Sequence, residues 1–435
     1  MIQLSVVCLF LANAWVGGAQ MDVVHSWRAI DFTFPSSAAK EAMIRTGRFI
    51  PKNIALIDVD VWEGHNTGQG QKVFVTMPRL KQGTPATLAT VGLTGILTPY
   101  PDWTWHREGD CNGITSVFRI DIDQCGRLWV LDSGVVDVFA QNPKMICPPQ
   151  IHVFNLLNDK LIGRYVFPND VVDNKSLLVT IVTDARDSKC QDTFAYIADV
   201  VNFKLIVFDA NNQKSWQVSN NYFYPYPLHG SFNINGVNFD LMDGILGLAI
   251  GPLTNGDRRL YFHSLASVRE SWVATSILRN STIFSEGDGA PRSFYVSQST
   301  RPSQSAAEAM SHSGVLFFGL LGENAIACWN SRLSYSPDNI IVVAKDVMRL
   351  PFASGVKIRN GFLWILSSTF QNYITNRIDP YATNYRILAG SLALLTHDTS
   401  CHYLIDSYIH YGSTPVSSYN QTYWNTYDNR FIFYK

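Results

Sequence analysis

The chain is built from a repeated unit of two β-strands joined by a tight turn, and this repetition limits the possible folds more than any other feature. In one unit, residues 116–123 alternate apolar and polar side chains, residues 124–126 form a turn that ends in Gly126, and residues 127–132 return. Alternation with a period of two is typical of strands with one buried face. Comparable units begin near residues 53, 116, 178, 247, 310 and 355 and are 45 to 69 residues apart.

Six comparable β-units indicate an architecture that repeats around an axis. A four-stranded propeller blade takes about 40 to 45 residues, so the remaining residues of each unit become loops. A small sheet cannot bury both faces alone, whereas six stacked sheets bury those faces and leave only short edges. The sequence therefore predicts an all-β, six-bladed β-propeller in which residues 20–435 form one domain. A protein of two β-sandwich domains is the alternative, and the lack of a Pro/Ser-rich linker disfavours it.

One short helix is expected before the first unit. Ser36 and Ser37 precede residues 38–45, which are mostly good helix formers, and Gly47 follows. A Ser N-cap and a Gly stop are typical helix boundaries. We expect this helix to lie at the periphery of the propeller.

The N-terminus has the features of a secretory signal peptide. Residues 2–19 carry no charge and are mostly apolar, and small residues occupy positions 17–19, where a signal peptidase cleaves. A membrane anchor is the alternative, but spanning needs about 20 apolar residues and this run ends at Gly17. We predict a signal peptide at residues 1–19 and a secreted, extracellular protein without membrane insertion.

The cysteine count fits secretion. Cys8 leaves with the signal peptide, and six cysteines remain: Cys111, Cys125, Cys147, Cys190, Cys328 and Cys401. An even number in an oxidising compartment predicts disulfides, although six cysteines allow 15 pairings. Two pairings are hypotheses. Cys328 with Cys401 would join the last two β-units, and Cys125 with Cys147 would close a loop within one unit. Three N-x-[ST] sequons predict glycosylation at Asn174, Asn280 and Asn420.

Charge and composition exclude some functions. Lys plus Arg number 34 and Asp plus Glu number 35, so the net charge is -1. A balanced chain lacks the basic field of a nucleic-acid-binding protein. Charged residues make up only 16% and aromatic residues 13%, which indicates a large apolar core.

Several stretches resemble the secreted insect Yellow and major royal jelly protein family. They are KVFVTMPR at 72–79, PYPDW at 99–103, CGRLWVLDSG at 125–134, DGILGLA at 243–249, GVLFFGL at 314–320 and CWN at 328–330. The resemblance runs from near His25 to at least Ile387. It implies a six-bladed propeller, secretion and a role in cuticle and melanin pigmentation. It also implies several possible activities, because some members bind biogenic amines, some resemble dopachrome-converting enzymes, and others are nutrient or structural proteins.

A ligand of a propeller is expected at its axis, where strand ends from all blades converge. Polar residues that end apolar strands are the channel candidates: Asp132, Ser133, Asp199, Asp243, Trp329, Asn330 and Ser367. A carboxylate would pair with the ammonium of an aromatic amine, and Trp329 would stack on its ring. The alternative for each residue is structural: the aspartates satisfy turn amides, and Trp329 is core. The expected partner is therefore a biogenic amine or another melanin-pathway small molecule.

No catalytic motif is present, so enzyme activity is left open. G-x-S-x-G and H-E-x-x-H are both absent. A dopachrome-type tautomerase would need a general base, for which His229, His263 and His312 are candidates without a motif. A structural or matrix-interaction protein of cuticle or eggshell, without ligand, is the other alternative. We expect no cofactor and no metal. The one group with metal-type ligands, at residues 397–402, contains Cys401, for which we favour a disulfide.

Overall fold

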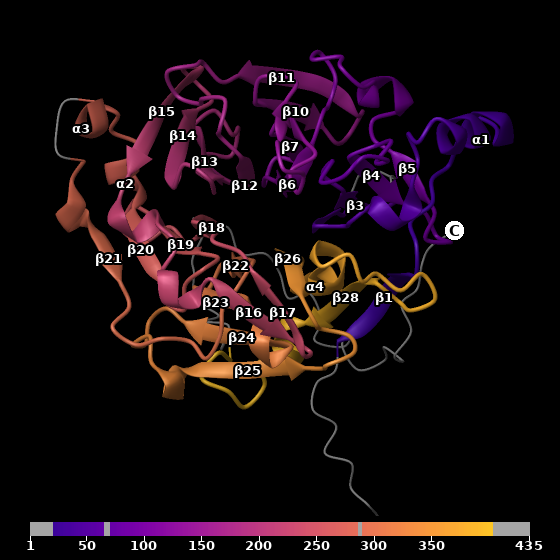
Figure 1. The fold of residues 1–435 in the computed structure, drawn as a ribbon. Coiled ribbons are helices and arrows are strands. Elements are labelled where there is room, and N and C mark those ends of the chain that lie inside the picture. Colours follow the sequence, from indigo (N-terminus) through magenta and orange to yellow (C-terminus); the bar gives the residue numbers. More distant parts are fainter. Residues whose placement is uncertain (1–20, 65–69, 286–288, 403–435) are drawn as a thin grey trace, which may run out of the picture.

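The computed structural model describes residues 21–64, 70–285 and 289–402. Within these ranges, six four-stranded antiparallel sheets surround a common centre (Figure 1), which confirms the six-bladed β-propeller. The expected signal peptide and Asn420 lie outside the described residues.

In each of the first five blades the strands follow one another in chain order from the axis outward, and in blade 2 a hairpin at residues 135–145 is inserted between the second and third strands. Blade 1 comprises β2 (Asp58–Trp62), β3 (Lys72–Thr76), β4 (Leu88–Val91) and β5 (Leu97–Pro99). Blade 2 comprises β6 (Val117–Ile122), β7 (Arg127–Asp132), β10 (Gln150–Asn155) and β11 (Lys160–Val166). Blade 3 comprises β12 (Leu178–Ala185), β13 (Thr193–Asp199), β14 (Lys204–Asp209) and β15 (Lys214–Ser219). Blade 4 comprises β18 (Ile245–Ile250), β19 (Arg259–Ser264), β20 (Ser271–Ala274) and β21 (Phe294–Val296). Blade 5 comprises β22 (Glu308–Met310), β23 (Val315–Leu320), β24 (Ala325–Asn330) and β25 (Ile340–Lys345).

Blade 6 closes the ring with strands from both ends of the described chain. It contains β26 (Ala353–Arg359), β27 (Phe362–Ser368), β28 (Tyr385–Ser391) and, at its outer edge, β1 (Asp22–Trp27). β1 pairs antiparallel with β28, with Trp27 opposite Tyr385. The N-terminal strand thus covers an edge that would otherwise be unpaired.

The turn predicted in the second unit shows why these sequences form hairpins. Gly126 has a φ of +68°, a conformation that glycine adopts without strain. One carboxylate oxygen of Asp123 accepts hydrogen bonds from the backbone N–H groups of Cys125 and Arg127, at 2.9 and 3.1 Å. The hairpin then runs with Ile122 opposite Leu128.

The apolar core lies mainly between blades. Leu131 and Ile151 of blade 2, for example, pack in one cluster with Ile181, Ile197 and Ile206 of blade 3. The opposite faces of β13 and β14 pack against blade 4. Each sheet therefore buries both faces against its neighbours, which explains the apolar runs in the inner strands.

The N-terminal helix α1 (Ser37–Arg45) lies outside this core, as predicted. The hydroxyl oxygen of Ser36 accepts the backbone N–H of Ala39 at 3.1 Å and caps the helix. None of its residues is buried. The other α-helices in the described ranges are α2 (Thr275–Leu278), α3 (Thr282–Ser285), α4 (Phe370–Ile374) and α5 (Leu392–Leu395). Among the described residues, no helix has the length and apolarity needed to cross a membrane.

All six cysteines of the described chain form disulfides, and one predicted pairing is wrong. Cys328–Cys401 is present and ties β24 of blade 5 to the segment after blade 6, as expected. Cys125 pairs with Cys190 and not with Cys147, which pairs with Cys111. Cys125 lies in the β6–β7 turn of blade 2, and Cys190 lies in the β12–β13 loop of the neighbouring blade 3. The partner of Cys125 is therefore determined by contact between neighbouring blades and not by closeness in the sequence.

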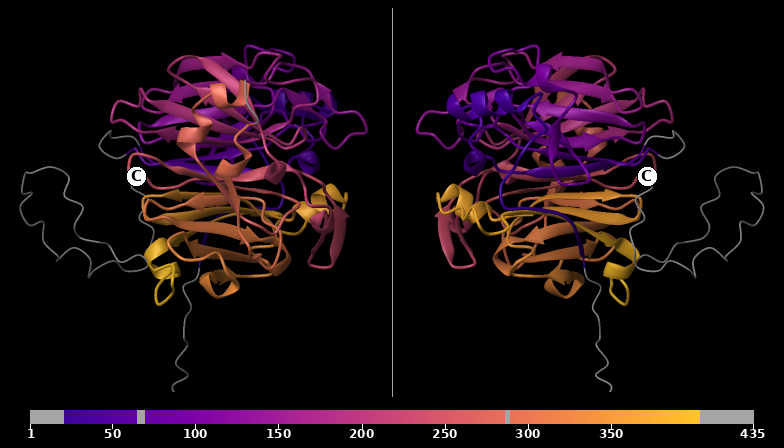
Figure 2. Two further views of the ribbon diagram at one scale, coloured as in Figure 1. Left: turned by 90° about the vertical axis from the view of Figure 1, so that its left-hand side faces the viewer. Right: turned by 90° about the vertical axis from the view of Figure 1, so that its right-hand side faces the viewer.

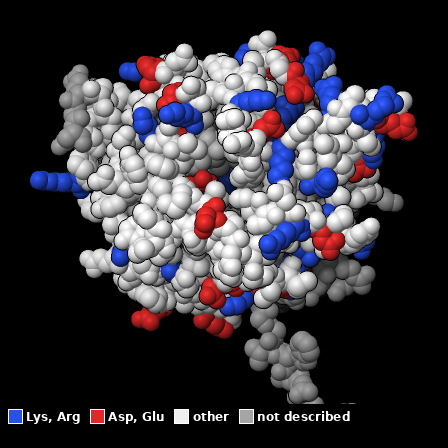
Figure 3. Space-filling model, viewed as in Figure 1, with Lys and Arg blue, Asp and Glu red and all other residues white. Residues whose placement is uncertain are grey.

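Two hairpins lie outside the blades, β8 (Val135–Val136) with β9 (Lys144–Met145) and β16 (Ser231–Ile234) with β17 (Val237–Asp240). The β16–β17 hairpin and α4 project from the same face of the ring (Figure 2). On that face, acidic and basic side chains are interspersed, without a large area of one sign (Figure 3).

Candidate functional site

Arg119 occupies the axis of the propeller and divides it into two cavities. Its side chain extends from β6 and is buried, and both cavities include it in their walls. The guanidinium donates hydrogen bonds to four other blades: to Thr180 Oγ1 at 2.9 Å and to the carbonyl oxygens of Leu246, Ala306 and Ser354 at 3.5, 2.7 and 2.8 Å. Burial lowers the pKa of this guanidinium, while Asp58 of blade 1 and Glu308 oppose that shift.

The smaller cavity, about 190 Å³, lies where the inner strands end. Its charged side chains largely pair with one another. Arg359 binds Asp60 at 2.7 Å and Asp121 at 3.0 Å, and Arg258 lies 3.0 Å from Asp184. These ion pairs link blade 6 to blades 1 and 2 and blade 3 to blade 4, and they leave little unpaired charge for a ligand apart from the carboxylate of Glu308.

The larger cavity, about 500 Å³, lies where the inner strands begin and falls within the size range of small-molecule sites. Its wall is mostly apolar and includes Phe118, Phe139, Phe352 and Phe370. The rings of Phe352 and Phe370 lie 4.9 Å apart, and those of Phe139 and Phe370 lie 6.1 Å apart. The cavity therefore presents aromatic surface on which a flat ring could pack.

Asp243 is the acidic residue in the wall of this apolar cavity. The loop before β18 positions it: the backbone oxygen of Asp243 accepts the N–H of Ala266 at 3.2 Å, and Gly244 N–H donates to Val200 O at 3.1 Å. A Cβ on Gly244 would lie 2.3 Å from the ring of Phe203, so glycine permits this close approach. Burial raises the pKa of the Asp243 carboxyl to about 7. Unlike the aspartates of the smaller cavity, it has no ion pair with any described residue.

The other sequence-predicted channel residues lie outside both axial cavities. The Asp132 carboxylate accepts the backbone N–H groups of Thr115, Ser116 and Gly134 at 2.7 to 3.1 Å. The Asp199 carboxylate similarly accepts backbone N–H groups from Leu177 and Asn202. Both aspartates therefore have the structural role that was the alternative.

The remaining four candidates are buried in turns and core or lie at the rim. Ser133 Oγ donates to Ser116 O at 2.9 Å, and Ser367 is fully buried at the end of β27. Trp329 packs between Tyr261 and Tyr335, with ring centroids 6.0 and 5.0 Å away. The Asn330 side chain donates to Ser400 O at 3.3 Å. The expectation that these residues line the channel therefore has no geometric support.

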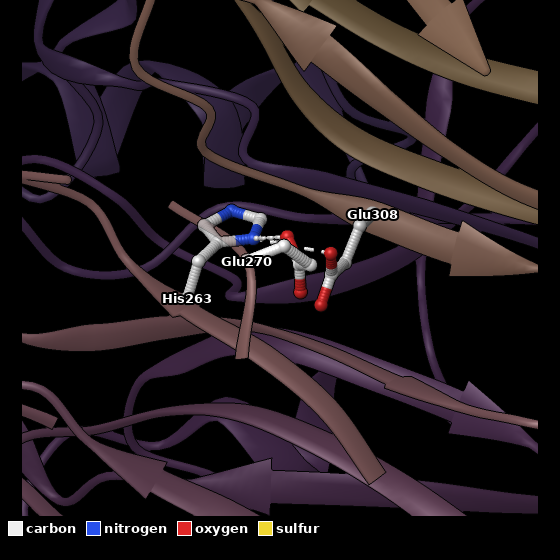
Figure 4. A group of neighbouring side chains, drawn as sticks. All are labelled: His263, Glu270 and Glu308. Carbon is white, nitrogen blue, oxygen red and sulfur yellow. Dashed lines mark hydrogen bonds and ion pairs between the residues drawn. The ribbon is translucent and has the colours of Figure 1, made fainter. Parts of the chain in front are cut away.

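The three histidines considered as bases occupy different surroundings. His229 is half-buried and stacks on Tyr226, with ring centroids 5.5 Å apart, and His312 borders the smaller cavity. His263 is fully buried together with Glu270 and Glu308 (Figure 4). Within the part of the chain that the structure describes, the wall of the larger cavity contains no histidine.

The glycosylation candidates also differ in position. Asn174 is exposed at the larger cavity, where it and Lys175 form part of the wall. Asn280 is exposed between α2 and α3. Both described asparagines are therefore at the surface, where a glycan needs its attachment site to be.

Comparisons with known proteins identify the family. A sequence profile described as Major royal jelly protein matches residues 115–401. Protein yellow of Drosophila erecta is 37% identical over 391 residues, which cover 87% of this chain and 70% of that protein. Protein yellow of Drosophila melanogaster is 36% identical over the same shares. The chain belongs to the Yellow and major royal jelly protein family.

Among solved structures, a catalytically inactive virginiamycin B lyase from Staphylococcus aureus covers 79% of this Yellow-family chain and 97% of its own, with 12% identity and a TM-score of 0.40. We draw no conclusion from a likeness of this degree. The family assignment rests on the sequence relatives and agrees with the propeller fold.

Proposed function

We propose that this Yellow-family protein is secreted, binds a small aromatic amine of the catecholamine or indoleamine type in the larger axial cavity, and acts in cuticle pigmentation and melanin metabolism. The observation that carries the proposal is the Asp243 carboxyl, which has no ion-pair partner among the described residues and lies in a cavity walled by aromatic rings. A ligand that combines one cationic group with one aromatic ring complements both features.

The cavity chemistry supports an amine over a neutral or anionic ligand. Moving an unpaired carboxylate out of water costs free energy, which is why the pKa of Asp243 rises. An ammonium group would offset that cost through a charge-assisted hydrogen bond. The ring of the ligand would pack against Phe352 and Phe370.

Three disulfides support an extracellular location, because such bonds persist in oxidising compartments. The pigmentation role is supported by the relatives named Protein yellow, which match most of the chain. The face shown in Figure 3 carries interspersed acidic and basic side chains, which agrees with a small-molecule partner better than with a nucleic acid.

Calorimetry with purified protein tests the binding step. We expect wild-type protein to bind dopamine or serotonin, and Asp243→Asn to bind about 10- to 100-fold more weakly, since a hydrogen bond to a charged group contributes about 1.5–3 kcal/mol. Asp240→Asn is the matched control, because Asp240 is exposed on β17 and bonds only Ser231 among the described side chains.

Two results would contradict the proposal. Wild-type protein that binds no such amine would favour a structural or matrix role without ligand. Equal affinity in the Asp243→Asn and Asp240→Asn variants would show that binding does not depend on the axial carboxylate.

A dopachrome-type tautomerase is a second candidate, and the pKa of Asp243 favours it. A carboxyl with a pKa of about 7 is suited to accept a proton from carbon near neutral pH. In that case, wild-type protein would accelerate the decay of dopachrome absorbance and Asp243→Asn would not. A decay rate unchanged by wild-type protein would exclude this activity.

A further inference from the structure

Three potential metal ligands meet between blades 4 and 5, far from any sequence motif. His263 is the second-last residue of β19, Glu270 immediately precedes β20, and Glu308 begins β22. Their side chains are fully buried. His263 Nδ1 lies 3.1 Å from Glu270 Oε2 and 3.1 Å from Glu308 Oε2, so both carboxylates point at the same ring nitrogen (Figure 4).

The other nitrogen of the ring fixes the tautomer. His263 Nε2 lies 3.2 Å from the carbonyl oxygen of Ser305, which can only accept a hydrogen bond. Nε2 therefore carries a proton, and Nδ1 is the atom left for the two carboxylates. A metal-bound histidine typically has this arrangement, in which one nitrogen donates to a backbone carbonyl and the other binds the ion.

The carboxylates have more acceptor capacity than the protein fills. Glu270 Oε1 and both oxygens of Glu308 accept no hydrogen bond from the described residues, although all are buried. Arg301 Nη1 donates to Glu270 Oε2 at 3.1 Å and supplies one positive charge for two carboxylates. Buried acceptors without donors are costly, so a further cation between them would be stabilised.

The backbone is shaped to admit this cluster. Gly247 of β18 lies directly opposite His263, and a Cβ at that position would approach the imidazole to 2.3 Å. Glycine therefore leaves the space that the buried ring occupies. Glu308 also borders the smaller axial cavity, which offers an ion a route from solvent.

We propose that His263, Glu270 and Glu308 bind one divalent ion of the first transition series, such as Zn²⁺, which ties blade 4 to blade 5. Ligand atoms about 2.0–2.2 Å from a shared ion lie about 3.0–3.5 Å from one another, which matches the two 3.1 Å separations. One imidazole with two carboxylates suits Zn²⁺ or Mn²⁺, whereas Ca²⁺ takes six to eight oxygen ligands.

The test uses full-length mature protein, freed of any purification tag and dialysed against a chelator. Titration with Zn²⁺ is expected to give one bound equivalent and to raise the melting temperature. Titration with Co²⁺ as a spectroscopic probe is expected to give visible absorption bands of a nitrogen- and oxygen-ligated ion. Both readouts are independent of amine binding, so they test this site even if the proposed function fails.

Glu308→Gln keeps the shape of the side chain. This variant is expected to bind no equivalent of Zn²⁺ and to show no Co²⁺ absorption bands. Glu323→Gln is the matched control, because Glu323 is exposed and pairs with Lys345 at 2.8 Å. The proposal is overturned if wild-type protein binds no stoichiometric ion, a result that needs no variant to fold. It is also overturned if folded Glu308→Gln binds the ion as wild-type protein does, because the ion would then occupy another place, such as the exposed His397–Asp398 pair.

Discussion

At the scale of single residues, Asp132 and Asp243 show that the groups around a carboxylate determine whether it is available to a ligand. Both follow apolar stretches and precede glycine or serine turns, so the local sequence does not distinguish them. The Asp132 carboxylate accepts hydrogen bonds from three backbone N–H groups within 3.1 Å, whereas Asp243 lies in the mostly apolar wall of the larger cavity. A carboxylate with turn amides is satisfied by the fold itself, and one without them gains most from a ligand.

The raised pKa of Asp243 predicts how amine binding depends on pH. The ammonium of the ligand, like that of lysine, stays protonated between about pH 5.5 and 8. Only the ionised carboxylate pairs with it, and the carboxyl of the free protein loses its proton near pH 7. Affinity should therefore be constant above about pH 8 and fall by up to about tenfold per pH unit below 7. Calorimetry across this range measures the effect.

Asp243→Asn provides the internal check on that profile. Its residual affinity should be the same at every pH in the range, since asparagine does not titrate. A pH profile that persists in this variant would assign the titration to another group. His229, whose pKa is lowered by burial and by nearby arginines, is the first alternative to examine.

At the scale of elements, local pattern was enough for strands and hairpins and failed for contacts between blades. The paired strands around Gly126 and the α1 helix follow from alternation, turn glycine and a Ser cap, all of which act within a few residues. The Cys125–Cys190 bond depends on which loops of blades 2 and 3 face each other after the ring closes. The cluster of His263, Glu270 and Glu308 escaped prediction for the same reason, since its three side chains come from two blades without a fixed spacing.

The Cys125–Cys190 disulfide makes a prediction about how blades 2 and 3 hold together. Replacing both cysteines with serine should lower the free energy of unfolding by about 2–4 kcal/mol, since the bond closes a loop of 65 residues. Arg127 also reaches blade 3, donating to Cys190 O and Thr193 Oγ1, so the blades should stay in contact. Denaturant unfolding of the variant measures the loss, and a change below about 0.5 kcal/mol would show that Arg127 and the apolar core suffice.

At the scale of the whole molecule, the ring of blades is held closed in different ways at its outer edge and at its axis. At the rim, β1 pairs with β28, so both ends of the described chain share one sheet. At the axis, the guanidinium of Arg119 links blade 2 to blades 3, 4, 5 and 6. The axial link also separates the apolar cavity from the paired charges of the smaller one, so the two cavities can serve different ligands.

Replacing Arg119 with methionine should therefore weaken the ring as a unit. The substitution keeps an apolar stem but leaves the carbonyl oxygens of Ala306 and Ser354 without this donor, and it leaves the buried Asp58 with less compensating charge. Removing one member of such a buried network costs about 3–5 kcal/mol. Denaturant unfolding should show this loss in a single transition, while Arg332→Met, at an exposed position, should change stability by less than about 0.5 kcal/mol. Equal stability of the two variants would mean that the ring is held by its blade interfaces and its rim alone, and that Arg119 serves only to partition the axis.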